Sequence, residues 1–452
     1  MISTVLAFIF TLALLVVVHE YGHYRVAVAC GVKVLRFSVG FGRVIWRRQA
    51  TPDSTEFVLC ALPLGGYVRM LDEREARVTA AEQHLAFNTK PLWQRAAVVV
   101  AGPMANFFLA IVLYAASHWV GTDEPKAVLS VPGAGSLSER AGVRSGDAVR
   151  AVSRDGVQWQ EVKSFIDFSG EVNRAVLSGE KLSLRVAADD GTAERNVLLA
   201  LDALEARDAD AGLMRKVGLG APFSEPLLGE IKPGGAGARA GLRAADRVLS
   251  VDGIAIVDAA RLRELIRANP SKVMQWKVSR AGQVIDAAVT PASVKEGNTQ
   301  VGRIEAFVGQ PPKMINVQYG LIDGITKAVT RTWDMSALTL SMFGKMLIGE
   351  ASLKNLSGPL TIADYAGQSA RLGLAYYLGF LAIVSVSLGV LNLLPLPVLD
   401  GGHLMYYLFE AATGHPVSDA WIERLQRSGV AIMLMMTSLA IYNDVARLLG
   451  LH

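Results

Sequence analysis

The sequence predicts a polytopic α-helical membrane protein with four transmembrane helices and a repeated, water-exposed insert between the second and third of them. Three observations support this fold class. Hydrophobic residues make up 51% of the 452 positions, and the mean hydropathy of +0.33 favours membrane embedding. Charged residues are scarce in four segments and dense between Asp123 and Arg371. Within this charged region, a segment that begins at Ala141 recurs at Ala240, a shift of 99 positions from 141 to 240.

The first apolar segment, residues 2–30, contains the pattern His19-Glu20-x-x-His23 in its second half and no charged residue before it. A charged residue in a spanning helix costs about 3 kcal/mol or more, so such a cluster requires a function. Residues four apart share one face of a helix, which allows His19 and His23 to bind one cation together. Glu20 can then reach a metal-bound water without being a ligand. The pattern predicts a metal site at membrane depth; polar groups that merely face a bundle interior are the alternative.

Three further segments are predicted to span the membrane, at residues 96–122, 372–399 and 428–443. Ten Lys and Arg residues lie between the first and second spans, whereas the residues before the first span carry no side-chain charge. By the positive-inside rule, this loop is cytoplasmic, and both termini and the insert lie outside the cytoplasm. The net charge of +4 is then a consequence of topology. No basic stripe with interleaved aromatic residues occurs, so no nucleic-acid partner is expected.

Each copy of the repeat continues into an Asp-Gly turn, at Asp155-Gly156 and Asp252-Gly253, flanked by alternating apolar residues typical of short strands. The pattern resembles the PDZ domain, so two tandem PDZ domains are expected, each α+β with a partly open β-barrel. The second copy departs from the pattern at Ala245, where glycine is expected. PDZ domains bind extended peptides by strand addition. Peptide or protein contact is therefore expected here, and a purely steric shield is the open alternative.

After the second copy, Pro311-Pro312 marks a linker, and apolar residues recur at helical spacing from Tyr319 to Gly349. This spacing predicts amphipathic helices that lie on the outer membrane surface or cap the bundle. An ordinary packed linker helix is the equally open alternative.

A catalytic zinc site usually takes three protein ligands, and Asp400 is the candidate for the third. It follows a segment with Asn392, Pro395 and Pro397, in which the prolines break the helix, and two glycines after Asp400 permit a turn. Irregular backbone at membrane depth is tolerated only where it is buried in protein or lines a polar cavity. The segment therefore predicts a site, with an Asp400 that faces cytoplasmic water as the alternative.

Together these motifs resemble the site-2 protease family of intramembrane zinc metalloproteases, in particular bacterial members with tandem PDZ domains between the second and third spans. The resemblance covers nearly the whole chain. It rests on the His19-Glu20-x-x-His23 pattern, the run from Asn392 to Asp400, Phe41 between two glycines, Leu64-Gly65-Gly66-Tyr67-Val68, and Gly102-Pro103-x-x-Asn106.

The resemblance implies that His19, His23 and Asp400 hold Zn²⁺ and that Glu20 is the general base. It also implies a multi-pass protein of the bacterial inner membrane, with the insert and both termini in the periplasm. The implied activity is regulated intramembrane proteolysis of a single-span membrane protein, an anti-sigma factor in the sigma-E envelope-stress response. The PDZ pair would exclude substrates whose outer domains are still intact.

A helical substrate must unwind before cleavage, and its freed backbone groups then need new partners. The family pattern favours a re-entrant β-hairpin whose Gly65-Gly66-Tyr67 edge pairs with the unwound segment, over a soluble cytoplasmic hairpin. The amide of Asn392 donates and accepts hydrogen bonds, so this residue is expected to contact the substrate backbone. For Asn106 the modest interpretation is an interhelical hydrogen bond.

Two other functional classes are compatible with parts of the sequence. One is a PDZ-containing membrane scaffold with a vestigial metal site, against which stands the presence of every expected ligand together with the base. The other is a transporter whose intramembrane charges serve ion passage, but only one broken segment is found.

The expected organisation is a first transmembrane helix at 1–30, a cytoplasmic loop with a re-entrant β-hairpin at 31–95, a second helix at 96–122, PDZ domains at 123–221 and 222–310, a linker with amphipathic helices at 311–371, a third helix with the zinc ligand at 372–402, and a loop with the fourth helix at 403–452.

Overall fold

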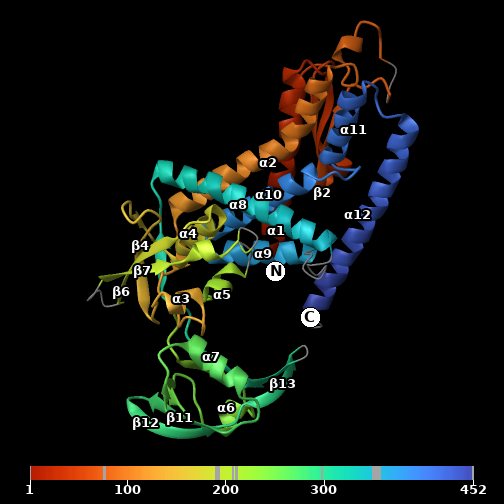
Figure 1. Ribbon diagram of the computed structural model, residues 1–452. Coiled ribbons are helices and arrows are strands. Elements are labelled where there is room, and N and C mark those ends of the chain that lie inside the picture. Colours follow the sequence, from red (N-terminus) through yellow and green to blue (C-terminus); the bar gives the residue numbers. More distant parts are fainter. Residues whose placement is uncertain are drawn as a thin grey trace. The chain divides into compact units, whose positions relative to one another are not determined.

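The computed structural model describes residues 2–74, 78–188, 194–205, 208, 212–296, 299–348 and 358–449. The chain divides into two compact units (Figure 1). Met1–Thr122 with Gln318–His452 forms the first unit, and Asp123–Val317 forms the second. The first unit contains every residue predicted for the metal site, and the second contains both copies of the repeat.

Four helices of the first unit are long and apolar enough to cross a membrane, which confirms the predicted number of spans. The fourth helix is longer than the predicted segment 428–443. Its 30 residues extend for about 45 Å at 1.5 Å per residue, so its charged ends reach beyond a hydrocarbon core of about 30 Å. The four helices are α1 (Ile2–Ala29), α2 (Leu92–Val120), α10 (Leu374–Leu393) and α12 (Asp419–Leu448).

Helix α2 packs against both α1 and α10. At Gly22 of α1, an added Cβ would lie 2.4 Å from the carbonyl oxygen of Ala101, so the two backbones are in direct contact. Small residues at such crossings are typical of membrane helices, because they let the backbones approach closely. Towards α10, the hydroxyl of Ser117 donates to the carbonyl oxygen of Ala375 at 2.8 Å. The apolar core between α2 and α10 includes Ala110, Leu113, Tyr114, Leu381, Ala382 and Val386.

The loop after α1 folds into a small sheet from two long, bent strands, β1 (Val34–Arg48) and β2 (Glu56–Met70). Because both strands bend, the first part of β1 pairs with both halves of β2. Gly40 and Gly65, with φ of +86° and +96°, supply left-handed backbone near the bends, which favours glycine. The resulting order of segments across the sheet is 66–70, 34–39, 56–59 and 44–48.

The third span ends before the acidic residue that the sequence assigns to the site. Helix α10 stops at Leu393, and a separate helix, α11 (Asp400–Thr413), begins at Asp400. Pro395 and Pro397 lie between them, lack a backbone N–H and bias the residue before each of them away from α-helix. The span is therefore shorter than the predicted range 372–402, and Asp400 starts the next helix instead of ending the span.

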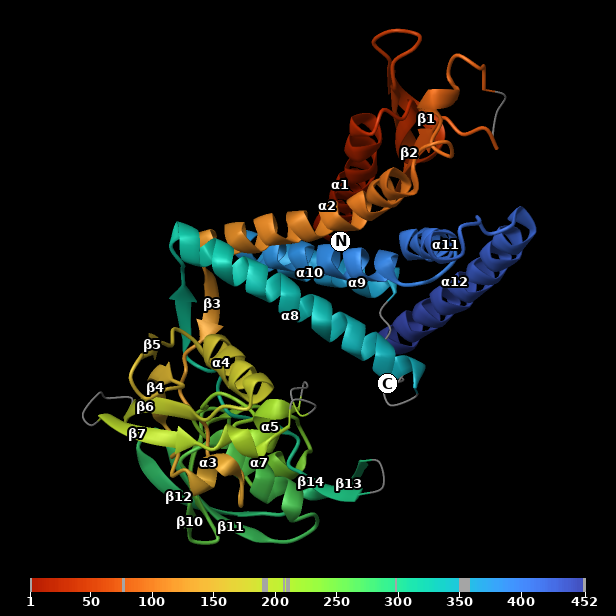
Figure 2. The same cartoon turned by 45° about the horizontal axis from the view of Figure 1, so that its top comes forward.

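Between the second unit and the third span along the chain, the described residues form two helices, α8 (Leu321–Leu347) and α9 (Pro359–Leu372). Helix α8 packs against α2 and α10 and diverges from α2 towards its C-terminal end, as Figure 2 shows. It also exposes apolar residues, among them Leu321, Ile322 and Trp333. The predicted helical stretch is thus a single amphipathic helix, and Gly349, at the end of that stretch, lies outside the described residues.

Asp444, near the C-terminal end of α12, caps the N-terminus of α9. Its side chain is only 1% exposed, and its carboxylate accepts hydrogen bonds from the backbone N–H groups of Gly358, Leu360 and Thr361 at 3.0, 2.9 and 3.2 Å. The Thr361 hydroxyl donates to the same carboxylate at 2.5 Å. The first N–H groups of a helix have no partner within it, and the helix dipole favours a negative charge beside them. The cap therefore binds α12 to α9.

We expect Asp444→Ala to lower the free energy of unfolding by about 2 kcal/mol or more, because losing a cap and leaving buried donors unpaired are each costly. Thermal unfolding in detergent, followed by circular dichroism, measures the change. Glu423→Ala is the matched control on the same helix, since it removes only an exposed ion pair with Arg427. Its effect should stay below about 1 kcal/mol. Equal melting temperatures for the two variants would contradict the capping role.

The second unit contains two four-stranded antiparallel sheets with the same strand order, one from each copy of the repeat. The orders are β5-β4-β6-β7 and β10-β9-β11-β12. The other described strands form two-stranded sheets, so the described residues contain several small sheets and no closed barrel. The first copy comprises α3 (Leu137–Arg140), β4 (Asp147–Ser153), β5 (Gln160–Glu161), α4 (Phe165–Ser178), β6 (Leu182–Ala188), β7 (Glu194–Leu199) and α5 (Leu213–Val217). The second comprises β8 (Leu228–Ile231), α6 (Ala236–Arg239), β9 (Arg247–Val251), β10 (Ile254–Ala255), α7 (Ala259–Ala268), β11 (Met274–Arg280), β12 (Gln283–Val289), β13 (Ala292–Glu296), β14 (Thr299–Arg303) and β15 (Ala306–Val308), while β3 (Thr122–Pro125) pairs with β16 (Met314–Val317).

The two copies share an aspartate-centred turn, which explains why the repeat is visible in the sequence. Asp147 accepts a hydrogen bond from the backbone N–H of Arg144 at 2.7 Å, and Asp246 accepts one from Arg243 at 2.8 Å. Each carboxylate is also paired with an arginine, from β7 in the first copy and from β11 in the second. Burial alone would raise the pKa of the Asp246 carboxyl, but its hydrogen bonds from Arg280 and Arg243 hold the pKa below its usual range.

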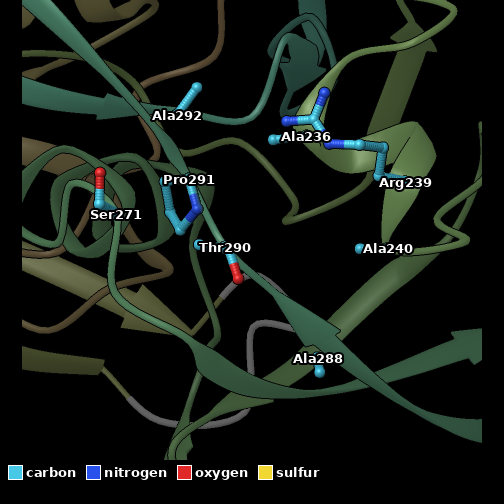
Figure 3. Close-up of a pocket in the computed structure, with 8 residues that line it drawn as sticks. All are labelled: Ala236, Arg239, Ala240, Ser271, Ala288, Thr290, Pro291 and Ala292. Atoms are coloured by element: carbon cyan, nitrogen blue, oxygen red, sulfur yellow. The ribbon is translucent and has the colours of Figure 1, made fainter.

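A pocket of about 380 Å³ lies in the second copy, beside α6 and the end of β12 (Figure 3). Its one charged lining residue, Arg239, donates a hydrogen bond to the carbonyl oxygen of Gly234 at 2.6 Å. None of the residues predicted for metal or substrate binding lines this pocket. The lining residues are Ala236, Arg239, Ala240, Ser271, Ala288, Thr290, Pro291 and Ala292.

Candidate metal centre

Three predicted ligands, from the first and third apolar segments of the sequence, meet in the first unit. His19 and His23 lie one turn apart on α1, and Asp400 is the first residue of α11. The Nε2 atoms of the two histidines are 3.2 Å apart, and Asp400 Oδ2 lies 3.3 Å from His19 Nε2 and 3.5 Å from His23 Nε2. The three side chains are largely buried, at 11% exposure for each histidine and 19% for Asp400.

These three atoms have the spacing of one face of a zinc tetrahedron. Donor atoms about 2.0–2.1 Å from a tetrahedral zinc lie about 3.3–3.4 Å from one another, close to the three distances found here. Asp400 Oδ2 is buried and accepts no hydrogen bond of normal geometry from the described residues. Buried polar atoms usually have a partner, so this oxygen is suited to bind a cation. Two imidazoles and a carboxylate also match the donor set of a hydrolytic zinc site. The residues therefore fit the metal.

The second helix orients the ring of His23. His23 Nδ1 lies 2.8 Å from the carbonyl oxygen of Val98 on α2, and that oxygen can only accept. Nδ1 must therefore carry the proton, which leaves the Nε2 lone pair free for a metal. The rings of His19 and His23 stand nearly perpendicular, at 84°, with centroids 4.8 Å apart.

Gly102 provides the space that the two rings occupy. A Cβ at this position of α2 would lie 2.2 Å from His23 Nε2 and 2.8 Å from His19 Cε1. The sequence shows Gly102 as part of a family motif without giving its role. The spacing of the motif does indicate a shared face: positions 98, 102 and 106 are four apart and lie on one face of α2, just as 19 and 23 lie on one face of α1. The two faces meet at the candidate metal centre.

Glu20 lies beside the candidate metal centre and is not one of the three residues whose donor atoms meet there. It follows His19 on α1, and its side chain is half-buried. On its other side lies the bent sheet, where a Cβ added at Gly66 would come within 3.1 Å of Glu20 Cγ. The sheet thus packs closely against the Glu20 side chain at Gly66.

The structure also places the residues predicted to bind substrate. Gly65, Gly66 and Tyr67 lie in β2, where the outer segment 66–70 begins. This segment pairs with residues 34–39 on one side and with no described strand on the other. Tyr67 stacks on Phe41 with ring centroids 6.0 Å apart. Asn392 is half-buried in the last turn of α10, and no described contact joins its side chain to the three donor atoms.

An ion pair that the sequence does not indicate holds α11 against α2. Arg95 donates to both carboxylate oxygens of Glu410, at 2.5 and 3.2 Å, with side chains 16% and 21% exposed. The Arg95 guanidinium also lies 5.1 Å from the centre of the Tyr407 ring. A bidentate pair fixes both distance and orientation. It therefore anchors the helix whose first residue is Asp400.

Comparisons with known proteins all match this chain to zinc metalloproteases or peptidases. A family model described as Peptidase family M50 matches residues 7–436. The chain is 42% identical, over 99% of each chain, to the Ralstonia nicotianae protein named "Putative zinc metalloprotease RSc1411". It is 39% identical to the Regulator of sigma-E protease RseP of Escherichia coli, over 98% of each chain. With Protease RseP of Yersinia pestis the identity is 37%, again over 98% of each chain.

Proposed function

The chain belongs to peptidase family M50, the site-2 proteases, and is a metalloprotease, and from this premise we propose that it cuts single-span membrane proteins within or beside their membrane segment. The observation that carries the proposal is the triangle of His19, His23 and Asp400 donor atoms, with Glu20 beside it. Membership of a peptidase family argues against a scaffold with a vestigial site and against a transporter.

His19, His23 and Asp400 would hold Zn²⁺, and Glu20 would act as the general base. When bound, zinc lowers the pKa of water and polarises a peptide carbonyl. The Glu20 carboxylate would take the proton of the attacking water and pass it to the departing amide nitrogen. Glu20 suits this task because it is adjacent to a ligand yet outside the donor triangle.

The bent sheet would supply the partners that an unwound substrate needs. Segment 66–70 offers a free strand edge, and Gly66 brings this edge next to Glu20. A substrate strand added there would have its carbonyls held by backbone N–H groups beside the general base. Asn392 is the further polar group that we propose contacts the substrate backbone. Tyr67 would border the edge, where its ring stacks on Phe41.

The topology and the partners follow from the same premise. We propose an inner-membrane protein whose first loop is cytoplasmic and whose second unit and termini are periplasmic, because the Lys and Arg residues are concentrated in that loop. The two similar sheets of the second unit are the proposed PDZ domains, which would exclude substrates with intact outer domains. The proposed substrate is an anti-sigma factor, in keeping with two relatives named RseP.

Metal removal tests the proposed activity directly. The protein purified in detergent should cut a synthetic single-span membrane peptide, lose this activity when a chelator removes its metal, and regain it with Zn²⁺. The measurements are bound metal by elemental analysis and product by mass spectrometry. Full cleavage by preparations shown to be free of bound metal would refute the zinc mechanism.

A further inference from the structure

Asn106 on α2 lies against the second ligand nitrogen of His19. Its side chain is fully buried, and its Nδ2 lies 3.0 Å from His19 Nδ1. The other end of the amide, Oδ1, is buried and has no hydrogen-bond partner among the described residues. A buried amide in contact with a ligand histidine calls for an explanation, because buried polar atoms are almost always paired.

The chemistry of imidazole decides which end of the amide should face His19 when zinc is bound. A metal at Nε2 uses the lone pair of that atom, so the proton of the neutral ring is on Nδ1. Nδ1 is then a donor, and the amide Nδ2 is a donor too. Two donors cannot form a hydrogen bond. A half-turn of the amide replaces Nδ2 by Oδ1, which accepts from Nδ1–H.

We propose that Asn106 is a positioning residue of the metal centre, whose Oδ1 accepts the His19 Nδ1–H hydrogen bond when zinc is bound. This inference rests on the proposed zinc site. The two ligand histidines are then held alike, His23 by the Val98 carbonyl and His19 by the Asn106 carbonyl, both from one face of α2. Such partners fix the orientation of a ligand ring and raise its basicity.

An amide suits this position because it can serve both neutral forms of the ring. With the proton on Nε2, His19 would donate towards Asp400, 3.3 Å away, and Nδ1 would accept from the Asn106 NH₂ group. With the proton on Nδ1, the turned amide accepts. His23 lacks this freedom because the Val98 carbonyl oxygen only accepts. The amide thus lets His19 exchange one form for the other as zinc arrives, without losing its partner.

The packing of the helices does not require the amide. The contact between α2 and α10 at this level uses the backbone carbonyl of Asn106, which accepts from the Ser385 hydroxyl at 2.7 Å. That bond does not involve the side chain of Asn106. Leucine has the same branching of heavy atoms as asparagine, with a bulkier side chain and no polar atom, and aspartate has the same shape as asparagine with oxygens that accept.

The test compares zinc affinity in Asn106→Leu and Asn106→Asp, by competition with a zinc chelator in detergent. Asn106→Leu should bind Zn²⁺ about 10–100-fold more weakly than the parent. Asn106→Asp should retain the parental affinity, because a carboxylate oxygen can replace Oδ1. Ser117→Ala is the control on the same helix, since it removes a buried hydroxyl bonded to Ala375 and should leave zinc affinity unchanged.

Two results would overturn the inference. One is parental zinc affinity in Asn106→Leu. The other is an equal loss of affinity in the Leu and Asp variants, which would mean that the amide acts through packing. His19→Ala serves as the reference for a lost site. If the parent itself binds no more zinc than His19→Ala, the proposed zinc site fails, which is distinct from failure of the role of Asn106.

Discussion

Glu20→Gln should lower the rate of peptide cleavage by about 10²–10⁴-fold while zinc remains bound. Glutamine keeps the size and shape of the side chain but cannot take up a proton at neutral pH. Because Glu20 lies outside the triangle of donor atoms, its replacement leaves all three ligands in place. Rates measured with the synthetic single-span peptide, together with bound metal, give both quantities for the same sample.

Asp400→Ala is the comparison that separates the general base from a ligand. It removes one corner of the triangle, so both zinc and cleavage should be lost. If Glu20→Gln cleaved at the parental rate, the assignment of the general base would be wrong. If Asp400→Ala kept stoichiometric zinc, the third ligand would have to be another residue.

Gly102→Ala is expected to remove the metal centre without touching a ligand. The new Cβ would lie 2.2 Å from His23 Nε2, far inside van der Waals contact, and 2.8 Å from His19 Cε1. Each histidine must turn its ring away, or the two helices must separate. Either response moves the donor atoms out of the spacing that zinc requires. We expect loss of bound zinc and of cleavage comparable to that of Asp400→Ala.

A second glycine-to-alanine change provides the control for Gly102→Ala. Gly379 lies in the spanning helix α10, where an added Cβ would meet only Ser117 Oγ at 3.8 Å, an ordinary contact. Gly379→Ala should keep zinc and activity. A Gly102→Ala protein with full zinc content would show that the rings have room to adjust and would contradict the steric argument.

The sequence singled out the three side chains that meet, but it did not predict their surroundings. His19 and His23 are visible because their spacing is local to one helix, and Asp400 because prolines break the chain before it. The roles of Gly102 and Asn106 depend on which face of α2 meets α1. That pairing is tertiary, and a single sequence does not specify it.

The ends of elements were also less predictable than their existence. The prolines predicted a break, but a charge-free segment continues to Leu399, so the predicted span ran past the end of α10 at Leu393. The charge-free segment 428–443 was expected to cross the membrane only with its flanks, and the helix does continue into its charged flanks, from Asp419 to Leu448. In the bent sheet, β1 pairs with both halves of β2, and no local pattern indicates this double pairing. The aspartate turns of the repeat were recognisable because each is a short local motif.

The cap at Asp444 also limits how the fourth helix can move. Near its C-terminal end, α12 is tied to α9 by the Asp444 hydrogen bonds, and nearer its N-terminal end Gly429 lies against Pro397 and Val398, just before Asp400. Because these hydrogen bonds resist sliding, a movement of α12 away from the segment that precedes Asp400 would be a tilt about its C-terminal part. The displacement that such a tilt produces grows with distance from the cap, so it is larger at Gly429, beside Pro397, than at Asp444.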